Sequence, residues 1–557
     1  ADLISDPTIS SNLLSSDFSA VLSNIAPGSQ KNWQITFIGE EVLGMNASGV
    51  YALGVKPDLA GNYEATVVTT PWFFNADIKP TNVAFVIPLT TLNNHLANGE
   101  IKDQDRDLAE AKRLTNLILN NSDSKISWIQ DSALSGWVSQ LTESADSDVS
   151  IRLGSVIDEL KPAGFLPFGS ADLAALSVAD QQRDLSDAIE FTRVIVGEQP
   201  VFYAPTLGAA DSKTVSLLSS QGIRTIVSNE FLRGNARVTT PAVATSDSNP
   251  VLVHDLATSS CLIGSDESAA AFFKTVTCIK SEIGMITAES PQKSRSIIVL
   301  APNTWKVSSD QLSKLIAGLS DHNWMQLTTL DLVAATAPTE NYVATQSADP
   351  ADFSRALVRQ AQNLKVNTES VSALYDDQEL AAGFTAARIL GYSELWPSNA
   401  RATEYLTENI SLLNEYLNAV SIQASGRITT PEENSEIPIT IVNESDSAVS
   451  VSIDLTSTAT SRFSAQPTGV IQVDSGQRIT VPVAITLVGA GVVDVQAQLI
   501  APNGERFGEV ENIQISSAAY SQFARTLVWG AFGLLVLLAL SNFVKRRKDK
   551  RSIETAR

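Results

Sequence analysis

The sequence predicts a multidomain protein of α/β and β type: a central (β/α) barrel-like domain, flanking β-sandwich units, a helical pair and one C-terminal transmembrane helix. Three observations predict it. Short apolar runs alternate with amphipathic stretches in the middle of the chain, apolar and polar residues alternate near both ends, and one long segment close to the C-terminus carries no charge. At 557 residues the chain is too long for one ordinary core, so several domains are expected.

Residues 1–78 form the predicted N-terminal β-rich domain. Apolar and polar residues alternate there in three runs, at 33–38, 49–55 and 64–70. Such alternation is typical of strands that are buried on one face. The aromatic run at 71–74 closes this domain.

Residues 79–338 are the predicted degenerate (β/α) barrel-like domain. Amphipathic stretches such as 105–119 and 211–220 separate seven short apolar runs, at 83–87, 126–129, 201–203, 225–227, 251–253, 296–300 and 325–327. Continuous apolar strands with helices between them indicate a parallel sheet that is buried on both faces. About seven such units favour a barrel, complete or broken, and an open doubly wound sheet is the alternative.

Two further domains follow. Residues 350–418 carry two apolar stripes at helical spacing, one through Leu357 and Leu364 and one through Leu406 and Leu413, which predicts a helical pair docked on the barrel. Residues 420–516 return to alternation, at 437–442, 449–455, 478–485 and 492–499. With turn signals about every ten residues, this pattern predicts an immunoglobulin-like β-sandwich without the family's cysteines and tryptophan.

Residues 526–544 are the predicted transmembrane helix, because these 19 residues include no charged side chain. At about 1.5 Å per residue they span roughly 28 Å, close to the hydrocarbon thickness of a bilayer. The tail at 545–557 is basic, with seven Lys or Arg against two Asp or Glu, and cationic flanks stay cytoplasmic. We therefore expect a single-pass protein of the cell membrane with an extracytoplasmic N-terminal ectodomain and a cytoplasmic C-terminus.

Export of the ectodomain requires a signal, but the chain opens with Ala1-Asp2-Leu3 and no apolar segment. We expect that the numbering begins after cleavage of a signal peptide, and a shortened chain is the alternative. Cys261 and Cys278 fit an oxidising compartment. They are a possible disulfide or, equally, two free thiols in the core.

The charge of the ectodomain argues against nucleic acid as a partner. The chain has a net charge of −22, and without its basic tail the balance is −27. Such a surface repels nucleic acid and anionic headgroups.

Several phrases of the sequence resemble an actinobacterial family of uncharacterised envelope proteins, DUF6049. They include Pro71 with Trp72, Ile87 to Leu89 followed by Asn94 and His95, and the segments 99–108, 127–134, 166–176 and 437–443. The terminal helix and basic tail complete the resemblance, which covers nearly the whole chain and includes no catalytic signature. Members tend to be encoded beside a MurJ-like lipid II flippase, which implies a part in peptidoglycan or envelope assembly.

The barrel region also resembles, faintly, family-57-type glycoside hydrolases and polysaccharide deacetylases. In those enzymes an Asp or Glu projects from the strand ends. Here Thr206 stands where that pattern would supply a carboxylate, and Asn303 ends another strand without an acid.

Glycoside hydrolysis needs two carboxylates about 5 to 10 Å apart. The carboxylates near predicted strand ends are Asp131, Asp172, Glu230 and Asp255. Asp131 and Asp172 each precede a helical stretch, where an Asp is a natural N-cap. Asp255 is therefore the best catalytic candidate, paired with Asp131 or Glu230.

No motif indicates a cofactor or a metal. The three histidines, His95, His254 and His322, show no metal-ligand spacing and are expected in loops or on the surface. The sequence has no phosphate-binding loop, dinucleotide fingerprint or nucleophile elbow.

The leading hypothesis is a non-catalytic, membrane-anchored protein that binds a protein or glycan in envelope assembly, with the MurJ-like flippase as the first partner to test. The competing hypothesis is a carbohydrate-active hydrolase or deacetylase with a relocated carboxylate pair. A purely structural spacer is the third.

Overall fold

The computed structural model describes residues 47–55, 66–73, 77–145, 147–197, 199, 201–205, 208–231, 241–246, 248–265, 269–320, 322–338, 340–341, 353–517 and 520–553. The chain divides into two compact units, each of which is described by itself. The first consists of Ala1–Val358 and Ala386–Tyr405, and the second of Arg359–Thr385 and Leu406–Arg557. The predicted strand at 33–38 lies outside the described residues.

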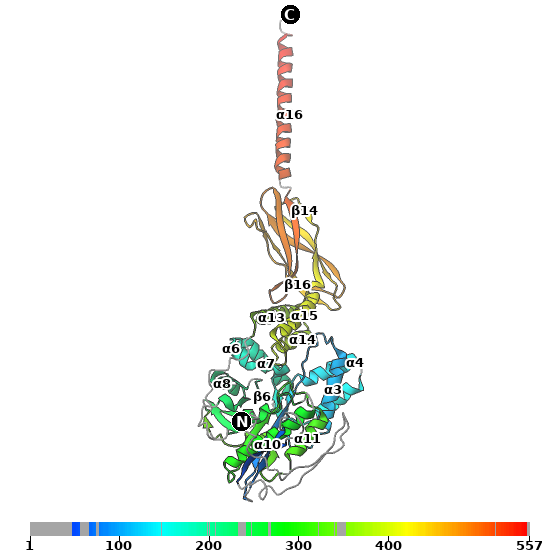
Figure 1. Cartoon of the computed structure of the whole chain (residues 1–557). Coiled ribbons are helices and arrows are strands. Elements are labelled where there is room, and N and C mark those ends of the chain that lie inside the picture. The colour runs from blue at the N-terminus through cyan, green and yellow to red at the C-terminus, as the bar shows by residue number, and fades with distance from the viewer. Residues whose placement is uncertain are drawn as a thin grey trace, which may run out of the picture. The chain divides into compact units, whose positions relative to one another are not determined.

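The first unit is built on a closed barrel of seven parallel strands (Figure 1). In ring order they are β10 (Arg295–Leu300), β3 (Thr81–Leu89), β4 (Ser127–Asp131), β5 (Gly164–Leu166), β6 (Val201–Tyr203), β7 (Ile223–Ser228) and β9 (Asn249–His254). The ring closes because β10 pairs with β3 on one side and with β9 on the other, where Ile298 lies beside His254. The predicted barrel is thus confirmed, and it is complete.

Six of the seven predicted runs are strands of this ring. The seventh, at 325–327, is β11 (Met325–Thr328), which pairs with the first half of β3 outside the ring. Its place in the ring belongs to β5, which is only three residues long and therefore shows no period in the sequence. The short strands β8 (Val243–Ser246) and β12 (Glu340–Asn341) extend the sheet beyond β9.

The barrel has a packed interior. Along β3 the side chains alternate, so that Ala84 and Val86 point into the barrel and Val83, Phe85 and Ile87 point out towards the helices. The interior cluster is completed by residues from the other strands: Ile129, Leu166, Phe202, Ile226, Leu252 and Ile298.

Helices cover the outside of the barrel, and capping side chains fix the N-terminal ends of several of them. Asp103 caps α3 (Gln104–Leu119), and Ser308 with Gln311 forms a capping box at α11 (Ser309–Leu319). The remaining helices of this region are α4 (Leu134–Ala145), α5 (Asp148–Glu159), α6 (Leu173–Val178), α7 (Gln182–Val196), α8 (Ser212–Ser220), α9 (Leu256–Ser260), α10 (Ala269–Glu289) and α12 (Leu330–Ala334), with 3-10 turns η2 (Phe168–Ser170) and η3 (Asn229–Phe231).

The N-terminal β-rich region contributes an antiparallel hairpin to the first unit. Its strands are β1 (Gly49–Val55) and β2 (Thr66–Trp72), in agreement with two of the predicted runs. The hairpin packs on α10, where Gly284 lies so close to Pro71 that an added Cβ would come within 2.6 Å of it. Only glycine therefore fits at this contact.

The region predicted as a helical pair contains three helices: α13 (Arg355–Tyr375), α14 (Gln378–Leu390) and α15 (Asn399–Asn418). The predicted stripes belong to α13 and α15. The prediction omitted α14, which begins at a turn where the Asp377 side chain accepts a hydrogen bond from the backbone N–H of Leu380.

The second unit includes the predicted β-sandwich. One sheet has the order β13 (Val420–Gln423), β15 (Asn434–Asn443), β19 (Arg478–Leu487) and β17 (Phe463–Ala465). The other has β14 (Arg427–Thr430), β21 (Arg506–Ser517), β20 (Gly491–Ile500), β16 (Val449–Thr456) and β18 (Ile471–Val473). Buried Ile437, Ile439 and Ile441 alternate with outward side chains, as expected for a strand with one buried face.

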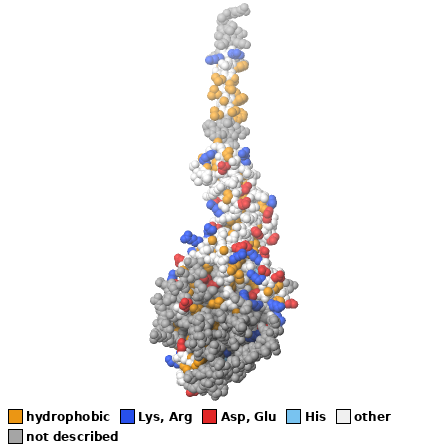
Figure 2. Space-filling view, viewed as in Figure 1, with side chains coloured by type: hydrophobic (Ala, Val, Ile, Leu, Met, Phe, Trp, Pro, Cys, Tyr) orange, Lys and Arg blue, Asp and Glu red, His pale blue; other side chains and the backbone are white. Residues whose placement is uncertain are grey.

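The last helix, α16 (Tyr520–Ile553), has the apolar segment that the sequence predicts. The stretch Thr526–Arg546 is 21 residues long and none of it is buried, so by length and composition it can cross a membrane. Figure 2 shows hydrophobic side chains along this helix and Lys or Arg at the end of its apolar stretch, where Lys545 and Arg546 lie. The helix fits a single-pass membrane protein.

Candidate functional site

The carboxyl ends of the seven barrel strands, with the loops that follow them, form one rim. In enzymes built on parallel barrels this end carries the active site, because side chains from several strands converge there. All four predicted carboxylates belong to loops or strand ends of the rim. We call the ends of β4, β5 and β6 its acid side, and the ends of β7 and β9 its histidine side.

Asp131, the last residue of β4, is buried and holds the loop after β5. Its Oδ1 accepts hydrogen bonds from the backbone N–H groups of Ala133 (2.8 Å) and Gly169 (2.9 Å), and its Oδ2 accepts one from the Ser170 hydroxyl (2.9 Å). Burial raises the pKa of Asp131 to about 7 although these three donors oppose the change. The carboxyl thus fixes a turn and the start of α4.

The loop that Asp131 holds has an unusual backbone. Gly169 and Ser170 both have positive φ, at 63° and 51°. A side chain at position 169 would also come within 2.5 Å of Leu390. Glycine is required here because a β-carbon would be strained in both respects.

A second acidic group on the acid side is centred on Tyr203, the last residue of β6. Its buried Oη accepts a hydrogen bond from the backbone N–H of Ala174 (3.0 Å). The same oxygen lies 2.9 Å from Asp172 Oδ1 and 3.1 Å from Glu394 Oε1. Asp172 also caps α6, as predicted, by accepting from the N–H of Ala175.

Residues 391–396, which we call the strap, bring Glu394 to the rim. The backbone N–H of Glu394 donates to Ser170 O (3.0 Å), and that of Asp172 donates to Tyr392 O (2.9 Å). Glu394 Oε2 also lies 3.4 Å from Asn303 Nδ2, in the loop after β10. The strap therefore contacts loops that follow β5 and β10 and the end of β6.

On the histidine side, Asp255 is the N-cap of α9. It accepts hydrogen bonds from the N–H and the hydroxyl of Thr258 (2.9 and 2.7 Å) and from Asn229 Nδ2 (3.1 Å). Asn229 in turn accepts from the N–H of Leu256 (3.0 Å). The best catalytic candidate of the sequence is thus bound to its own helix and to the loop after β7.

His254 precedes Asp255 at the end of β9 and is buried. Its Nδ1 lies 3.2 Å from Ser259 Oγ, which also accepts from the N–H of Leu300 (3.1 Å). Burial lowers the pKa of His254 to about 4, against the raising effect of Asp255. The ring is neutral at pH 7.

Glu230 lies in η3, and its side chain is exposed. Asp131, Glu230 and Asp255 thus stand at the ends of three different strands. Among the hydrogen bonds of the described residues, none joins any two of these three side chains. At the rim, Asp172 and Glu394 both lie within hydrogen-bond distance of the Tyr203 hydroxyl.

Sequence reasoning missed Tyr203 and Glu394 as a pair, because 191 residues separate them. The expectation that the histidines lie in loops or on the surface is wrong for His254, which is buried in β9, and His95 is a buried loop residue. His95 Nε2 is 2.8 Å from Asp107 Oδ2 and its Nδ1 is 3.0 Å from Gln140 Oε1. Both ring nitrogens are occupied, so His95 is not a base with a free nitrogen.

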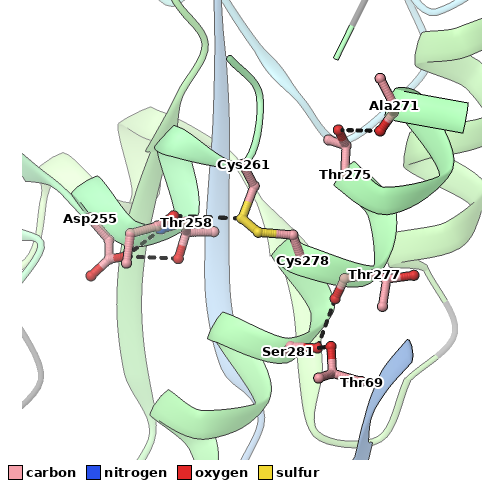
Figure 3. Close-up of a disulfide and its surroundings, with 10 residues drawn as sticks. Thr69, Asp255, Thr258, Cys261, Ala271, Thr275, Thr277, Cys278 and Ser281 are labelled. Atoms are coloured by element: carbon pink, nitrogen blue, oxygen red, sulfur yellow. Dashed lines mark hydrogen bonds between the residues drawn. A yellow bond between two sulfur atoms is a disulfide. The ribbon is translucent and has the colours of Figure 1, made fainter. Parts of the chain in front are cut away.

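A disulfide joins Cys261 to Cys278, with Cα atoms 5.8 Å apart. It connects α9, which Asp255 caps, to α10 (Figure 3). Further along α10, the hydroxyls of Ser281 and Thr69 lie 2.6 Å apart, so α10 also contacts β2. The disulfide therefore links the histidine side of the rim to the helix that carries the N-terminal hairpin.

Two hollows lie at the opposite end of the barrel. One, of about 390 Å³, is lined by Ser127 and Trp128 at the start of β4 and by Lys161 and Thr329. Another, of about 280 Å³, lies beside Arg224 at the start of β7. In the part of the chain that the structure describes, no group of three or more His, Cys, Asp or Glu side chains is placed to hold a metal ion.

Solved structures similar to parts of this chain differ widely in sequence. An α-amylase, AmyC from Thermotoga maritima, matches 61% of this chain and 93% of its own with 7% identity and a TM-score of 0.41. WR4, an MSP family member of Caenorhabditis elegans, matches 18% of this chain and 99% of its own with 12% identity and a TM-score of 0.15. A FixG-related protein from Vibrio parahaemolyticus matches 18% and 94%, with 11% identity and a TM-score of 0.14. No curated protein matches the chain.

The family comparison covers almost the entire sequence. Residues 18–552 match a family of unknown function, DUF6049. This span includes the hairpin, the barrel, the three helices, the sandwich and nearly all of α16. The chain belongs to the DUF6049 family.

Proposed function

We propose that this protein is a non-catalytic, membrane-anchored binding or scaffold protein of cell-envelope assembly, with its barrel and sandwich on the extracytoplasmic side. The observation that carries the proposal is the use of the rim carboxyls. Asp131 and Asp255 each accept three hydrogen bonds, from the segment that follows their own strand and from the loop after a neighbouring strand. Carboxyls whose oxygens already accept these hydrogen bonds hold the backbone in place and are not available to bind a substrate.

The proposed orientation rests on the charge next to the apolar helix. Lys545 and Arg546 directly follow its apolar stretch, and basic flanks remain on the cytoplasmic side. Labelling with a membrane-impermeant thiol reagent tests this on intact cells. Val510→Cys, at an exposed sandwich position, should be labelled, whereas Ser552→Cys should react only after permeabilisation. The reverse pattern would overturn the orientation.

The proposed partner is a MurJ-like lipid II flippase or a protein that works beside it, as the family resemblance implies. Cross-linking and purification of the full-length protein from native membranes tests this. Enrichment of an envelope-assembly protein supports the proposal. A matched bait that keeps residues 520–557 and lacks the ectodomain should lose the partner. Equal recovery by both baits, or no envelope protein with either, would contradict it.

A carbohydrate-active hydrolase is the second candidate, and one observation favours it. Because Tyr203 Oη lies 2.9 Å from Asp172 Oδ1 and 3.1 Å from Glu394 Oε1, these two carboxyl oxygens are at most 6.0 Å apart. Retaining glycosidases hold their carboxyls about 5 Å apart. The Tyr203 hydroxyl, however, stands between the two carboxyls, where a scissile bond would have to lie. Glycan cleavage that Glu394→Gln abolishes would establish this alternative.

A further inference from the structure

The hollow of about 390 Å³ at the end of the barrel opposite to the rim, which we call the base hollow, has the features of a small-molecule site. Besides Ser127 and Trp128 at the start of β4, its lining comes from the last turns of α3 and α5 and from the start of α12. Sites for small molecules have volumes of roughly 300 to 1,000 Å³. The base hollow therefore has room for one small ligand.

The indole of Trp128 provides a buried hydrogen-bond donor in this lining. Side chains alternate along β4, so that Ile129 belongs to the interior of the barrel and Trp128 to the cluster between the barrel and its helices. Only 4% of Trp128 is exposed, and its Nε1 has no hydrogen-bond partner in the part of the chain that the structure describes. A buried N–H without an acceptor destabilises the fold, so an acceptor atom from a ligand is favoured beside it.

Ser127 adds a second buried donor. Its Oγ accepts a hydrogen bond from the backbone N–H of Leu330 (2.7 Å), and the hydroxyl keeps one proton to donate. The inner part of the base hollow is thus suited to a ligand that offers oxygen acceptors. A cation does not meet this requirement, because an ammonium group has protons to donate and no lone pair to accept with.

The outer part of the base hollow carries charges of both signs. Among the described residues that line it, the charged ones are Lys161, Glu159 and Asp331, and all three are exposed. Two carboxylates against one ammonium group disfavour an anionic ligand. The carboxylates accept hydrogen bonds and Lys161 donates them. A ligand that binds here therefore carries no net charge and offers both donors and acceptors.

Apolar side chains complete the lining, with Ile118, Ile126 and Val156 among them. They are suited to C–H groups of a ligand and do not compete for its hydroxyls. A sugar ring combines the required properties, because it is neutral, its hydroxyls both donate and accept, and its faces carry C–H groups. Neither an ion nor a purely apolar molecule combines all three.

We propose that the base hollow binds one neutral sugar ring. An oxygen of the ring or of a hydroxyl accepts from the N–H of Trp128, and the outer hydroxyls bond to the charged side chains at the mouth. The inference goes beyond the proposed function, since it assigns a ligand to the barrel whatever protein the ectodomain contacts. It is also separate from hydrolysis, because the rim carboxyls lie at the other end of the barrel.

Titration of the full-length protein with methyl glucoside and with N-acetylglucosamine, in a detergent that contains no sugar, tests the site. The indole N–H signal of Trp128 in the NMR spectrum, assigned by its loss in Trp128→Phe, should shift as the group gains an acceptor. The shift should saturate with a dissociation constant on the order of 1 mM, as expected for a ligand with few atoms. Trp137 is the internal control, because its Nε1 is also buried without a partner among the described residues but does not line the base hollow. A Trp128 signal that neither sugar moves, or that moves together with the Trp137 signal, would overturn the proposal.

Two exposed lysines give a matched pair of variants that does not depend on the folding of Trp128→Phe. Lys161→Gln should weaken sugar binding by about threefold to tenfold, because one donor at the mouth is lost. Lys125→Gln lies outside the lining and should bind as the unmodified protein does. Equal affinities of the two variants would place the sugar elsewhere. A sugar phosphate and glucosamine should bind more weakly than the neutral sugars, and stronger binding of either would overturn the proposed class of ligand.

Discussion

The two sides of the barrel rim respond to protons in opposite directions. On the acid side, burial raises the pKa of Asp131 to about 7 and also raises that of Asp172. On the histidine side, burial lowers the pKa of His254 to about 4. The physical cause is the same, because burial penalises the charged form, which is the anion of a carboxyl and the cation of an imidazole. On both sides of the rim, burial therefore favours the neutral form of the titrating group.

The signs follow from linkage. The raised pKa of Asp131 means that its contribution to stability is complete below about 3.8 and is lost as the pH rises towards 7. The lowered pKa of His254 means that its contribution is complete above 6.5 and is lost as the pH falls towards 4. Between pH 4 and 7 the contributions of Asp131 and His254 to the free energy of unfolding therefore change in opposite directions. The variants below remove a titrating group of one side, or a hydrogen bond, disulfide or glycine that stabilises the barrel.

The largest effect is expected for Asp131→Ala. The change leaves the N–H groups of Ala133 and Gly169 buried without an acceptor, which costs about 4 kcal/mol in the free energy of unfolding. Urea unfolding followed by tryptophan fluorescence measures it. Asp211→Ala is the matched control, because Asp211 caps α8 from an exposed position and its loss costs about 1 kcal/mol. Equal losses in the two variants would mean that Asp131 does not hold the loop.

The next effect concerns the pH dependence of stability. Asp131→Asn removes the titration of Asp131 and keeps those of Asp172 and His254, so from pH 4 to 6.5 its free energy of unfolding should rise by about 3 kcal/mol relative to the unmodified protein. In His254→Gln only the acid side remains, so it should fall over pH 4 to 7 by a similar amount. Unfolding midpoints over this pH range measure both. Slopes of the same sign in the two variants would refute the comparison.

The disulfide should stabilise the histidine side by about 3 kcal/mol, since Cys261 and Cys278 close a loop with a sequence separation of 17. We expect the double variant Cys261→Ser with Cys278→Ser to lose this amount in thermal unfolding. Hydrogen exchange should increase at the N–H of Asp255 on the histidine side and remain unchanged at that of Glu394. Equal increases at both positions would show that the disulfide stabilises the whole rim alike.

The smallest expected effect is the difference in stability between two glycine variants. One glycine is constrained by both packing and φ, and the other by φ alone. Gly169→Ala combines a φ of 63° with a β-carbon 2.5 Å from Leu390, and should cost about 2 kcal/mol. Gly222→Ala has a φ of 77° and no atom within 4 Å of the added carbon, so its cost of about 1 kcal/mol reports the backbone alone. Thermal unfolding of the two variants gives the difference. If Gly222→Ala is the more damaging, the contact with Leu390 is not what requires glycine.

The barrel could be predicted from the sequence because its strands are buried on both faces and are therefore continuously apolar. The sequence did not predict β5, because three residues give no pattern. The run that forms β11 was taken as the seventh strand of the barrel instead. The sandwich was predicted from its alternation, although the long strand β21 was not assigned from it. The prediction omitted helix α14, because the apolar stripes of α13 and α15 were sufficient for a pair of helices.

The candidate site was less predictable than the fold. The capping role of Asp172 could be read from the helix that follows it, and the structure confirms it. Its proximity to Glu394 could not, because the strap is 222 residues further along the chain and nothing local in Gly391 to Trp396 indicates a contact with the barrel. Burial of a polar residue beyond a strand end depends on tertiary packing, which a single sequence does not display.

One measurement tests the central claim most directly, namely that the rim carboxyls hold the fold and perform no hydrolysis. Purified full-length protein is incubated with peptidoglycan fragments and neutral polysaccharides, and newly released reducing ends are counted. The account predicts no release above that of a sample inactivated by unfolding, both for the unmodified protein and for Asp255→Asn. Release by the unmodified protein that Asp255→Asn or Glu394→Gln abolishes, without a change in unfolding temperature, would contradict it.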